Sequence, residues 1–174
     1  VARARDALQR GDAMEGRGRA RYSYGLNNSR TNEALVNAFT ALEGEACAGT
    51  VLVPSGLSAV TTAILSAVRP GSKILVPDNV YSPTRRFCDE SLPRFGVTTE
   101  YYDPLIGGGI ARHLAGASAL FLEAPGSHSL GMPAVPALAK SARAAGIPPM
   151  IDNTWATPLI FRPLEVGVDL AIYA

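Results

Sequence analysis

Short apolar runs of strand length alternate with helical segments along most of this chain. Strands are predicted at 50–54, 73–77, 97–102, 119–123, 147–151 and 168–174. One helix is predicted to begin at Thr31, which can cap it, and to end at Gly44. Further helices are predicted at 59–68, 107–114 and 133–145, and one that follows the strand at 73–77 is expected to end at about residue 92. Because successive parallel strands need crossover connections, this alternation indicates an α/β fold with an open, mostly parallel sheet and helices on both faces.

Composition narrows the class of protein. The chain has 174 residues, of which 47% are hydrophobic, so it can bury a sizeable core. The net charge of +1 argues against a nucleic-acid-binding surface. Cys47 and Cys88 have no metal-ligand spacing, so we predict no metal site and a reducing compartment. The Arg-rich N-terminus has no apolar signal core, and no apolar run reaches the roughly 18 residues that span a bilayer. We therefore expect a cytoplasmic protein without a membrane partner.

Polar residues follow three of the predicted strands. Ser55 and Gly56 form a turn between a strand and a helix, where backbone amides and the helix dipole favour a phosphate. Tyr81 follows the strand at 73–77, and Asp152 ends the apolar run at 147–151. Ligands of open α/β sheets bind beyond the carboxyl ends of strands. Together these groups suit a planar, phosphorylated, nitrogen-containing ring.

Each of these features also has a purely structural interpretation. Asp152 can cap a turn or a helix, and most Ser-Gly turns only begin a helix. The glycine pattern matches neither a P-loop nor a Gly-x-Gly-x-x-Gly turn, which argues against a dinucleotide-binding domain. His113 and His128 receive no functional role from the sequence.

Beyond these features, the sequence resembles the Cys/Met-metabolism family of pyridoxal-phosphate enzymes. The resemblance covers about residues 22–174. The segments that carry it are YSYG at 22–25, LEG at 42–44, PSGLSAV at 54–60, GVTT at 96–99, YDPLIG at 102–107 and MIDNTWA at 150–156.

The resemblance implies a fold and a set of roles. The fold is the large domain of PLP fold type I, which is aspartate-aminotransferase-like, and here it is incomplete. Asp152 is implied to pair with the pyridine nitrogen of pyridoxal 5'-phosphate (PLP), and Tyr81 to stack on its ring. The amides of Gly56 and Leu57 are implied to hold the phosphate. Tyr24 is implied to reach the active site of a neighbouring subunit, which makes the protein at least a dimer and, as is usual in the family, a homotetramer.

Two details favour the β-lyase branch of the family. The segment EAPGS at 123–127 is similar to the β-lyase form, and Trp155 replaces the Phe that is common in the γ-acting branches. The resemblance thus implies a lyase of transsulfuration and methionine biosynthesis, which converts L-cystathionine to homocysteine, pyruvate and ammonia by α,β-elimination. The alternatives are a γ-acting enzyme (cystathionine γ-synthase or methionine γ-lyase), a non-catalytic family member, and a non-catalytic nucleotide-binding-like domain.

The chain departs from the family pattern in two places. Leu26 stands where the family usually has a phosphate-binding arginine, and we consider Arg30 a candidate replacement; the alternative is a solvated Arg30. The lysine that forms a Schiff base with the cofactor is absent, because neither Lys73 nor Lys140 is suitably placed. We therefore expect residues 1–30 to form an arm on a neighbouring subunit and residues 31–174 to be the N-terminal part of the PLP-binding domain. The C-terminal part of the same polypeptide is then a further partner.

Overall fold

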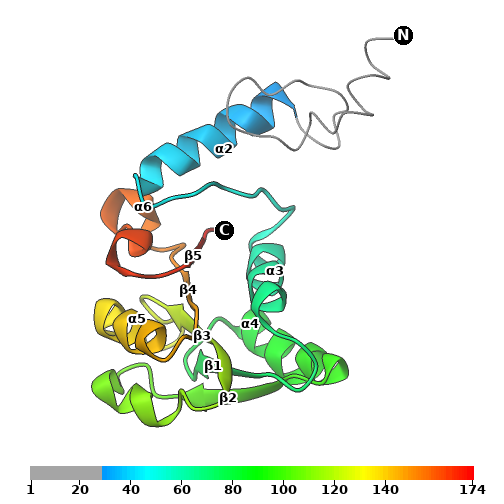
Figure 1. Cartoon of the computed structure of the whole chain (residues 1–174). Helices are drawn as coiled ribbons and strands as arrows, with labels where there is room; N and C mark the ends of the chain where they lie inside the picture. Colours follow the sequence, from blue (N-terminus) through cyan, green and yellow to red (C-terminus); the bar gives the residue numbers. More distant parts are fainter. Residues whose placement is uncertain (1–28) are drawn as a thin grey trace. The chain divides into compact units, whose positions relative to one another are not determined.

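The computed structural model describes residues 29–174 of the chain. These residues belong to two compact units, one ending at Leu52 and the other running from Val53 to Ala174 (Figure 1). The second unit contains the sheet. Residues 1–28, including Tyr24 and Leu26, lie outside the described part, so the predicted arm stays a prediction.

Helix α2, Arg30–Glu43, is the helix that the structure describes in the first unit. The predicted end at Gly44 is confirmed, with a φ of 86° that glycine adopts without strain. The predicted cap at Thr31 is wrong: Ser29 is the cap, and its Oγ accepts a hydrogen bond from the Asn32 amide at 3.1 Å. Helix α2 therefore begins at Arg30, which is its first residue and not a loop residue.

The strand predicted at 50–54 is absent. These residues form an irregular segment, and the side chain of Val51 is 81% exposed. A β-rich run becomes a strand only when a neighbouring strand pairs with it, because cross-strand packing supplies most of the stabilisation. No described strand pairs with this run.

The second unit is built on a five-stranded sheet in the order β2-β1-β3-β4-β5. Every neighbouring pair is parallel, as predicted. The strands are β1 Lys73–Pro77, β2 Thr98–Tyr102, β3 Ala117–Glu123, β4 Pro149–Asp152 and β5 Leu170–Ile172.

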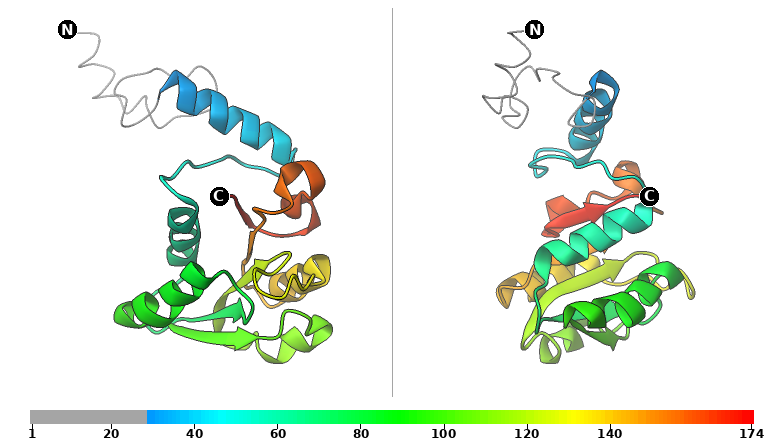
Figure 2. Two further views of the ribbon diagram at one scale, coloured as in Figure 1. Left: turned by 180° about the vertical axis from the view of Figure 1, so that it is seen from behind. Right: turned by 90° about the vertical axis from the view of Figure 1, so that its right-hand side faces the viewer.

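Helices cover both faces of this sheet, which confirms the predicted fold class. Alternate residues of one strand point to opposite faces. In β3, Phe121 packs with the face that contacts α3, Gly56–Ala67. Leu120 and Leu122 pack with the face that contacts α5, Val135–Ala144. Figures 1 and 2 show α3 and α5 on opposite sides of the strands.

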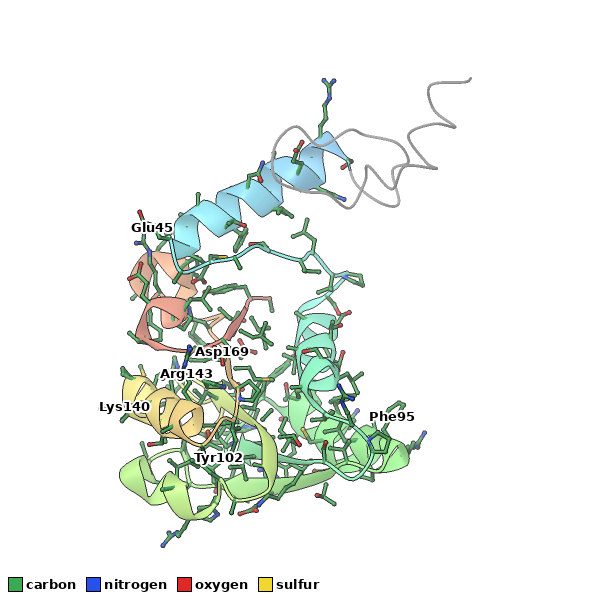
Figure 3. The ribbon with its side chains drawn as sticks, in the orientation of Figure 1. Glu45, Phe95, Tyr102, Lys140, Arg143 and Asp169 are labelled. Carbon is green, nitrogen blue, oxygen red and sulfur yellow. The ribbon has the colours of Figure 1, made fainter. Side chains whose placement is uncertain are left out.

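Shorter helical segments connect these elements. The helix expected to end near residue 92 is a succession of α, π and 3-10 turns, which reaches Phe95. The segments are α4 Ser82–Arg86, η1 Phe87–Ser91, η2 Leu92–Phe95, η3 Gly107–Arg112, α6 Thr157–Ile160 and η4 Pro163–Val166. On α5, Arg143 bonds Asp169 just before β5, with 3.0 Å between Nη1 and Oδ1 (Figure 3).

The edge strand β2 is tied to the rest of the sheet by a charged cluster. Lys73 Nζ donates to Glu100 Oε2 at 2.8 Å, and His113 Nδ1 lies 2.5 Å from Glu100 Oε1. The hydrogen bond from Lys73, followed by that from His113, holds the pKa of Glu100 below its ordinary value of 4.5. A carboxylate whose folded pKa is lowered stabilises the fold above its unfolded pKa.

We therefore predict that the stability contribution of Glu100 is lost in acid. The contribution is complete above pH 4.5 and disappears as the pH falls through the lowered folded pKa. Glu100→Gln should lower the melting temperature at neutral pH by a small amount, because the cluster is partly exposed. Melting curves recorded down to about pH 3 should show the two proteins converging. A difference that stays constant over that range would contradict this assignment.

Candidate functional site

The carboxyl ends of the parallel strands form one edge of the sheet. Strand β1 lies between β2 and β3, so the chain leaves β1 on one side and later returns on the other. This reversal creates a switch point between the carboxyl ends of β1 and β3, where open α/β sheets bind ligands. Tyr81 follows β1 after a short turn, and Glu123 is the last residue of β3.

Asp152 is the last residue of β4 and lies directly beside Glu123 in the register of β3 and β4. It is partly buried. Its Oδ1 accepts a hydrogen bond from the Thr154 amide at 3.0 Å, so the turn-capping role is present. Within residues 29–174, no hydrogen bond uses its Oδ2. One carboxylate oxygen is therefore fixed by the backbone, and the other remains available to a ligand.

The beginning of α3 supplies backbone donors to the same edge. Ser55 is the N-cap, and its Oγ accepts from the Ser58 amide at 3.1 Å. The amides of Gly56 and Leu57 take part in no hydrogen bond among the described residues, as expected for the first turn of a helix. Two amides at the positive end of a 12-residue helix form a site for an anion.

Gly56 is also required by close packing. A Cβ at this position would lie 2.1 Å from the Cβ of Ala174, which follows β5. The amide of Ala174 donates to Thr154 Oγ1 at 3.0 Å. The start of α3 is thus linked through Ala174 to the turn that holds Asp152.

Tyr81 offers an aromatic ring at the switch point. Its side chain is 48% exposed, and its hydroxyl makes no hydrogen bond within the described part of the chain. Both the amide and the carbonyl of the Tyr81 backbone make hydrogen bonds. The amide donates to Glu123 Oε2 at 2.9 Å, and the carbonyl accepts from the Arg85 amide at 3.0 Å. An exposed ring on a fixed backbone is suited to stacking against a flat ligand.

The sequence-predicted residues that the structure brings to this edge are Gly56, Leu57, Tyr81 and Asp152. The fifth, Tyr24, lies outside the described residues. The arrangement presents free amides, an exposed ring and a carboxylate at one end of the sheet. It is chemically able to hold a phosphorylated aromatic ring that carries a basic nitrogen.

Sequence reasoning missed Glu123 as a site residue. Glu123 is only 3% exposed, and burial, the largest influence, raises the pKa of its carboxyl above the ordinary value. Nearby Asp152 raises this pKa further, while hydrogen bonds from Ser127 and from the Tyr81 amide lower it. Its position in the sequence could have indicated this role, because Glu123, like Asp152, is a carboxylate at the end of an apolar strand.

The two lysines of the chain do not lie at this edge. Lys73 is the first residue of β1, at the opposite end of that strand, and bonds Glu100. Lys140 is exposed on α5 (Figure 3). No group of three or more His, Cys, Asp or Glu residues suited to a metal ion occurs in residues 29–174. No helix in that range is long and apolar enough to cross a bilayer.

Comparison with known proteins places these features in context. The family described as "Cys/Met metabolism PLP-dependent enzyme" matches residues 5–174. A Rhizobium johnstonii protein named "Putative cystathionine beta-lyase" is 50% identical over 163 residues, which are 93% of this chain and 40% of that protein. Cystathionine beta-lyase MetC of Escherichia coli is 38% identical over 166 residues, which are 93% of this chain and 41% of that protein.

Solved structures agree with the fold. The crystal structure of a cystathionine gamma-lyase from Lactobacillus plantarum, complexed with L-serine, superposes with a TM-score of 0.81 at 29% identity. The match covers 91% of this chain and 41% of that chain. The present chain spans about two-fifths of the length of the curated relatives it matches.

Proposed function

This chain belongs to the Cys/Met metabolism family of PLP-dependent enzymes, and we propose that the full-length protein is a carbon–sulfur lyase that acts on L-cystathionine by α,β-elimination. The products are homocysteine, pyruvate and ammonia. The observation that carries the proposal is the carboxyl edge of the sheet, where α3, the Tyr81 segment and β4 present the groups that PLP needs. The 50% identity to a protein with a cystathionine beta-lyase name supports the choice of reaction.

The residues present fit PLP. The phosphate dianion needs hydrogen-bond donors, and the unused amides of Gly56 and Leu57 lie at a helix N-terminus. The ring needs a flat apolar partner, which Tyr81 supplies. The basic ring nitrogen needs a carboxylate, and Asp152 keeps Oδ2 available. When bound, PLP stabilises negative charge at the α-carbon of an amino acid.

The chain's own residues then have distinct tasks. Asp152 keeps a proton on the ring nitrogen, because an ionised carboxylate beside a basic nitrogen favours the protonated form. Tyr81 holds the tilt of the ring and covers one of its faces. We propose that Tyr24 reaches the site of a neighbouring subunit, as part of the arm predicted for residues 1–30. Because neither Lys73 nor Lys140 lies at this edge, we propose that the catalytic lysine belongs to the part of the full-length protein that residues 1–174 do not cover.

The oligomeric state and the cellular location of the protein follow from the same proposal. A site that takes Tyr24 from a second subunit is complete only in an oligomer, and we propose a homotetramer built as a dimer of dimers. A reducing, cytoplasmic environment keeps Cys47 and Cys88 as free thiols, which is their state in the structure.

The γ-acting reaction is the second candidate. The observation in its favour is the fold match to a cystathionine gamma-lyase. The sequence EAPGS at 123–127 favours the β-lyase instead, because γ-acting branches usually carry Asn-Pro at the position of Ser127 and His128. Fold similarity does not separate the two reactions, since both use the same cofactor on the same scaffold.

Product analysis of the full-length protein with L-cystathionine tests the proposal. Release of pyruvate together with homocysteine supports α,β-elimination. Release of 2-oxobutanoate together with cysteine identifies the γ-acting alternative. A protein that binds PLP yet releases neither keto acid contradicts the lyase proposal.

We predict that the aromatic ring of Tyr81, more than its hydroxyl, retains the cofactor. Tyr81→Phe keeps the ring and should change the dissociation constant of PLP less than threefold. Tyr81→Ala removes the stacking surface and should weaken binding by about tenfold, equivalent to about 1.4 kcal/mol. Titration of the PLP-depleted protein measures both constants. Equal losses in the two variants would show that the hydroxyl, or a packing role, matters instead.

A further inference from the structure

Glu123 is a buried carboxylate that the roles above leave unused. Both of its oxygens are occupied: Oε2 accepts from the Tyr81 amide at 2.9 Å, and Oε1 accepts from the Ser127 hydroxyl. Burying a carboxylate is costly unless hydrogen bonds offset the lost hydration. The two donors belong to different segments, one after β1 and one after β3. Glu123 therefore joins the two sides of the switch point.

The loop that follows β3 strengthens this connection. Asn79 Nδ2 donates to Ser129 Oγ at 2.8 Å, and Ser82 Oγ lies 3.1 Å from His128 Nε2. The loop also lies close to the Tyr81 segment. A Cβ added at Gly126 would lie only 1.9 Å from Asn79 Nδ2. Residues on both sides of Tyr81 are thus bonded to one loop.

The loop itself has a defined shape. The Gly126 amide donates to the Gly131 carbonyl at 3.0 Å, and the Leu130 amide donates to the Gly126 carbonyl at 3.0 Å. These bonds close the turn over 126–131. Of all these contacts, the hydrogen bond that Glu123 accepts from the Tyr81 amide is the one that involves the backbone of Tyr81 itself.

The ring of Tyr81 depends on this backbone for its direction. Its hydroxyl is unbonded among residues 29–174, and about half of the side chain is exposed. The carbonyl of Tyr81 is fixed by α4 through Arg85, and the amide is fixed by Glu123. If Glu123 did not accept the Tyr81 amide, only the hydrogen bond from the Arg85 amide to the Tyr81 carbonyl would hold this backbone.

We propose that Glu123 is a positioning residue of the cofactor site: by accepting the Tyr81 amide, its carboxylate fixes the Tyr81 ring in the orientation that stacks on PLP. This inference rests on the proposed function, since it concerns the same site. Glu123 acts through Tyr81 and need not touch the cofactor. Its effect on cofactor binding therefore requires the Tyr81 ring.

A double-mutant cycle on the full-length protein tests the inference. The dissociation constant of PLP is measured for wild type, Glu123→Ala, Tyr81→Ala and the double variant. Glu123→Ala should weaken PLP binding by about fivefold to tenfold in the wild-type background. In the Tyr81→Ala background, the same substitution should have no further effect, because the ring that Glu123 orients is gone. Additive losses would overturn the proposal.

Two further variants separate positioning from charge and from packing. Glu123→Gln keeps an acceptor for the Tyr81 amide and gains a donor for Ser127, so its dissociation constant should stay within about threefold of wild type. Ser127→Ala removes the hydroxyl that donates to Glu123 but keeps the backbone of Ser127 and the bond from the Tyr81 amide, so it serves as the matched control, with a smaller loss than Glu123→Ala. If Glu123→Gln binds as weakly as Glu123→Ala, the negative charge is the relevant property and the proposal fails.

The circular dichroism of bound PLP gives a second measurement, because it reports the asymmetric surroundings of the ring. Glu123→Ala saturated with PLP should show an altered band, and Glu123→Gln should show the wild-type band. An unchanged band in Glu123→Ala would overturn the proposal. A wild-type protein that does not bind PLP would instead refute the proposed function, which distinguishes the two failures.

Discussion

Asp152→Asn should abolish most of the activity of the full-length protein while leaving its fold intact. The loss should be about 100-fold or more in kcat, which corresponds to about 2.7 kcal/mol of activation free energy. A neutral amide no longer favours a proton on the ring nitrogen, so the cofactor becomes a weaker acceptor of charge. The fold should survive, because the amide oxygen of asparagine still accepts the hydrogen bond from Thr154. Steady-state kinetics and melting curves measure the two effects.

Asp103→Asn is the matched control for this substitution. Asp103 follows the edge strand β2, and its Oδ1 accepts the Leu105 amide at 2.8 Å, just as Asp152 accepts the amide two residues ahead. The local chemistry of the two changes is therefore the same, but Asp103 follows the edge strand β2, and not one of the strands whose ends present Tyr81, Glu123 and Asp152. Asp103→Asn should keep normal turnover. Near-normal turnover of Asp152→Asn would refute the assigned role.

Phe121→Ala should cause the largest loss of stability among single substitutions in the sheet. Phe121 lies in the central strand β3, is 0% exposed and packs against the face that α3 covers. Truncating a buried phenylalanine removes apolar contacts and leaves a cavity, at a cost of about 3–5 kcal/mol. The start of α3 carries the anion-binding amides, so cofactor binding should weaken as well.

Phe95→Ala provides the comparison for Phe121→Ala, since the same atoms are removed. Phe95 is 53% exposed at the end of η2, where its side chain points away from the sheet (Figure 3). Its truncation should change the free energy of unfolding by no more than about 1 kcal/mol. Denaturation monitored by circular dichroism measures both variants. Equal losses would show that β3 does not lie at the centre of the core.

The fold class was predictable because the chain repeats one simple pattern. Apolar runs such as Phe121 with its neighbours, each followed by a helical segment, allow few arrangements other than a parallel sheet between helices. The prediction failed where local pattern and long-range pairing disagree. Residues 50–54 have the composition of a strand, but no described strand pairs with them. The cap of α2 was misplaced because Ser29 and Thr31 are both good caps, and only backbone geometry distinguishes them.

The candidate site was predictable in part for a related reason. In a parallel sheet, all residues that follow strands reach the same edge, so the positions of Tyr81 and Asp152 in the sequence sufficed to group them. Gly56 was grouped with them through a predicted strand at 50–54 that is absent, and it reaches the edge because the start of α3 packs against Ala174. The hydrogen bond from Tyr81 to Glu123 was not predictable, because it depends on strand order. Only the adjacency of β1 and β3 brings the two residues together. Sequence alone does not give that order.

A crystal structure of the full-length protein with bound PLP would show whether the carboxyl edge of the sheet is the cofactor site. We expect the phosphate to contact the amides of Gly56 and Leu57, the ring to lie against Tyr81, and the Asp152 carboxylate to contact the ring nitrogen. Glu123 should still accept the Tyr81 amide. A phosphate bound away from the start of α3, or a ring nitrogen without a carboxylate partner, would contradict this assignment.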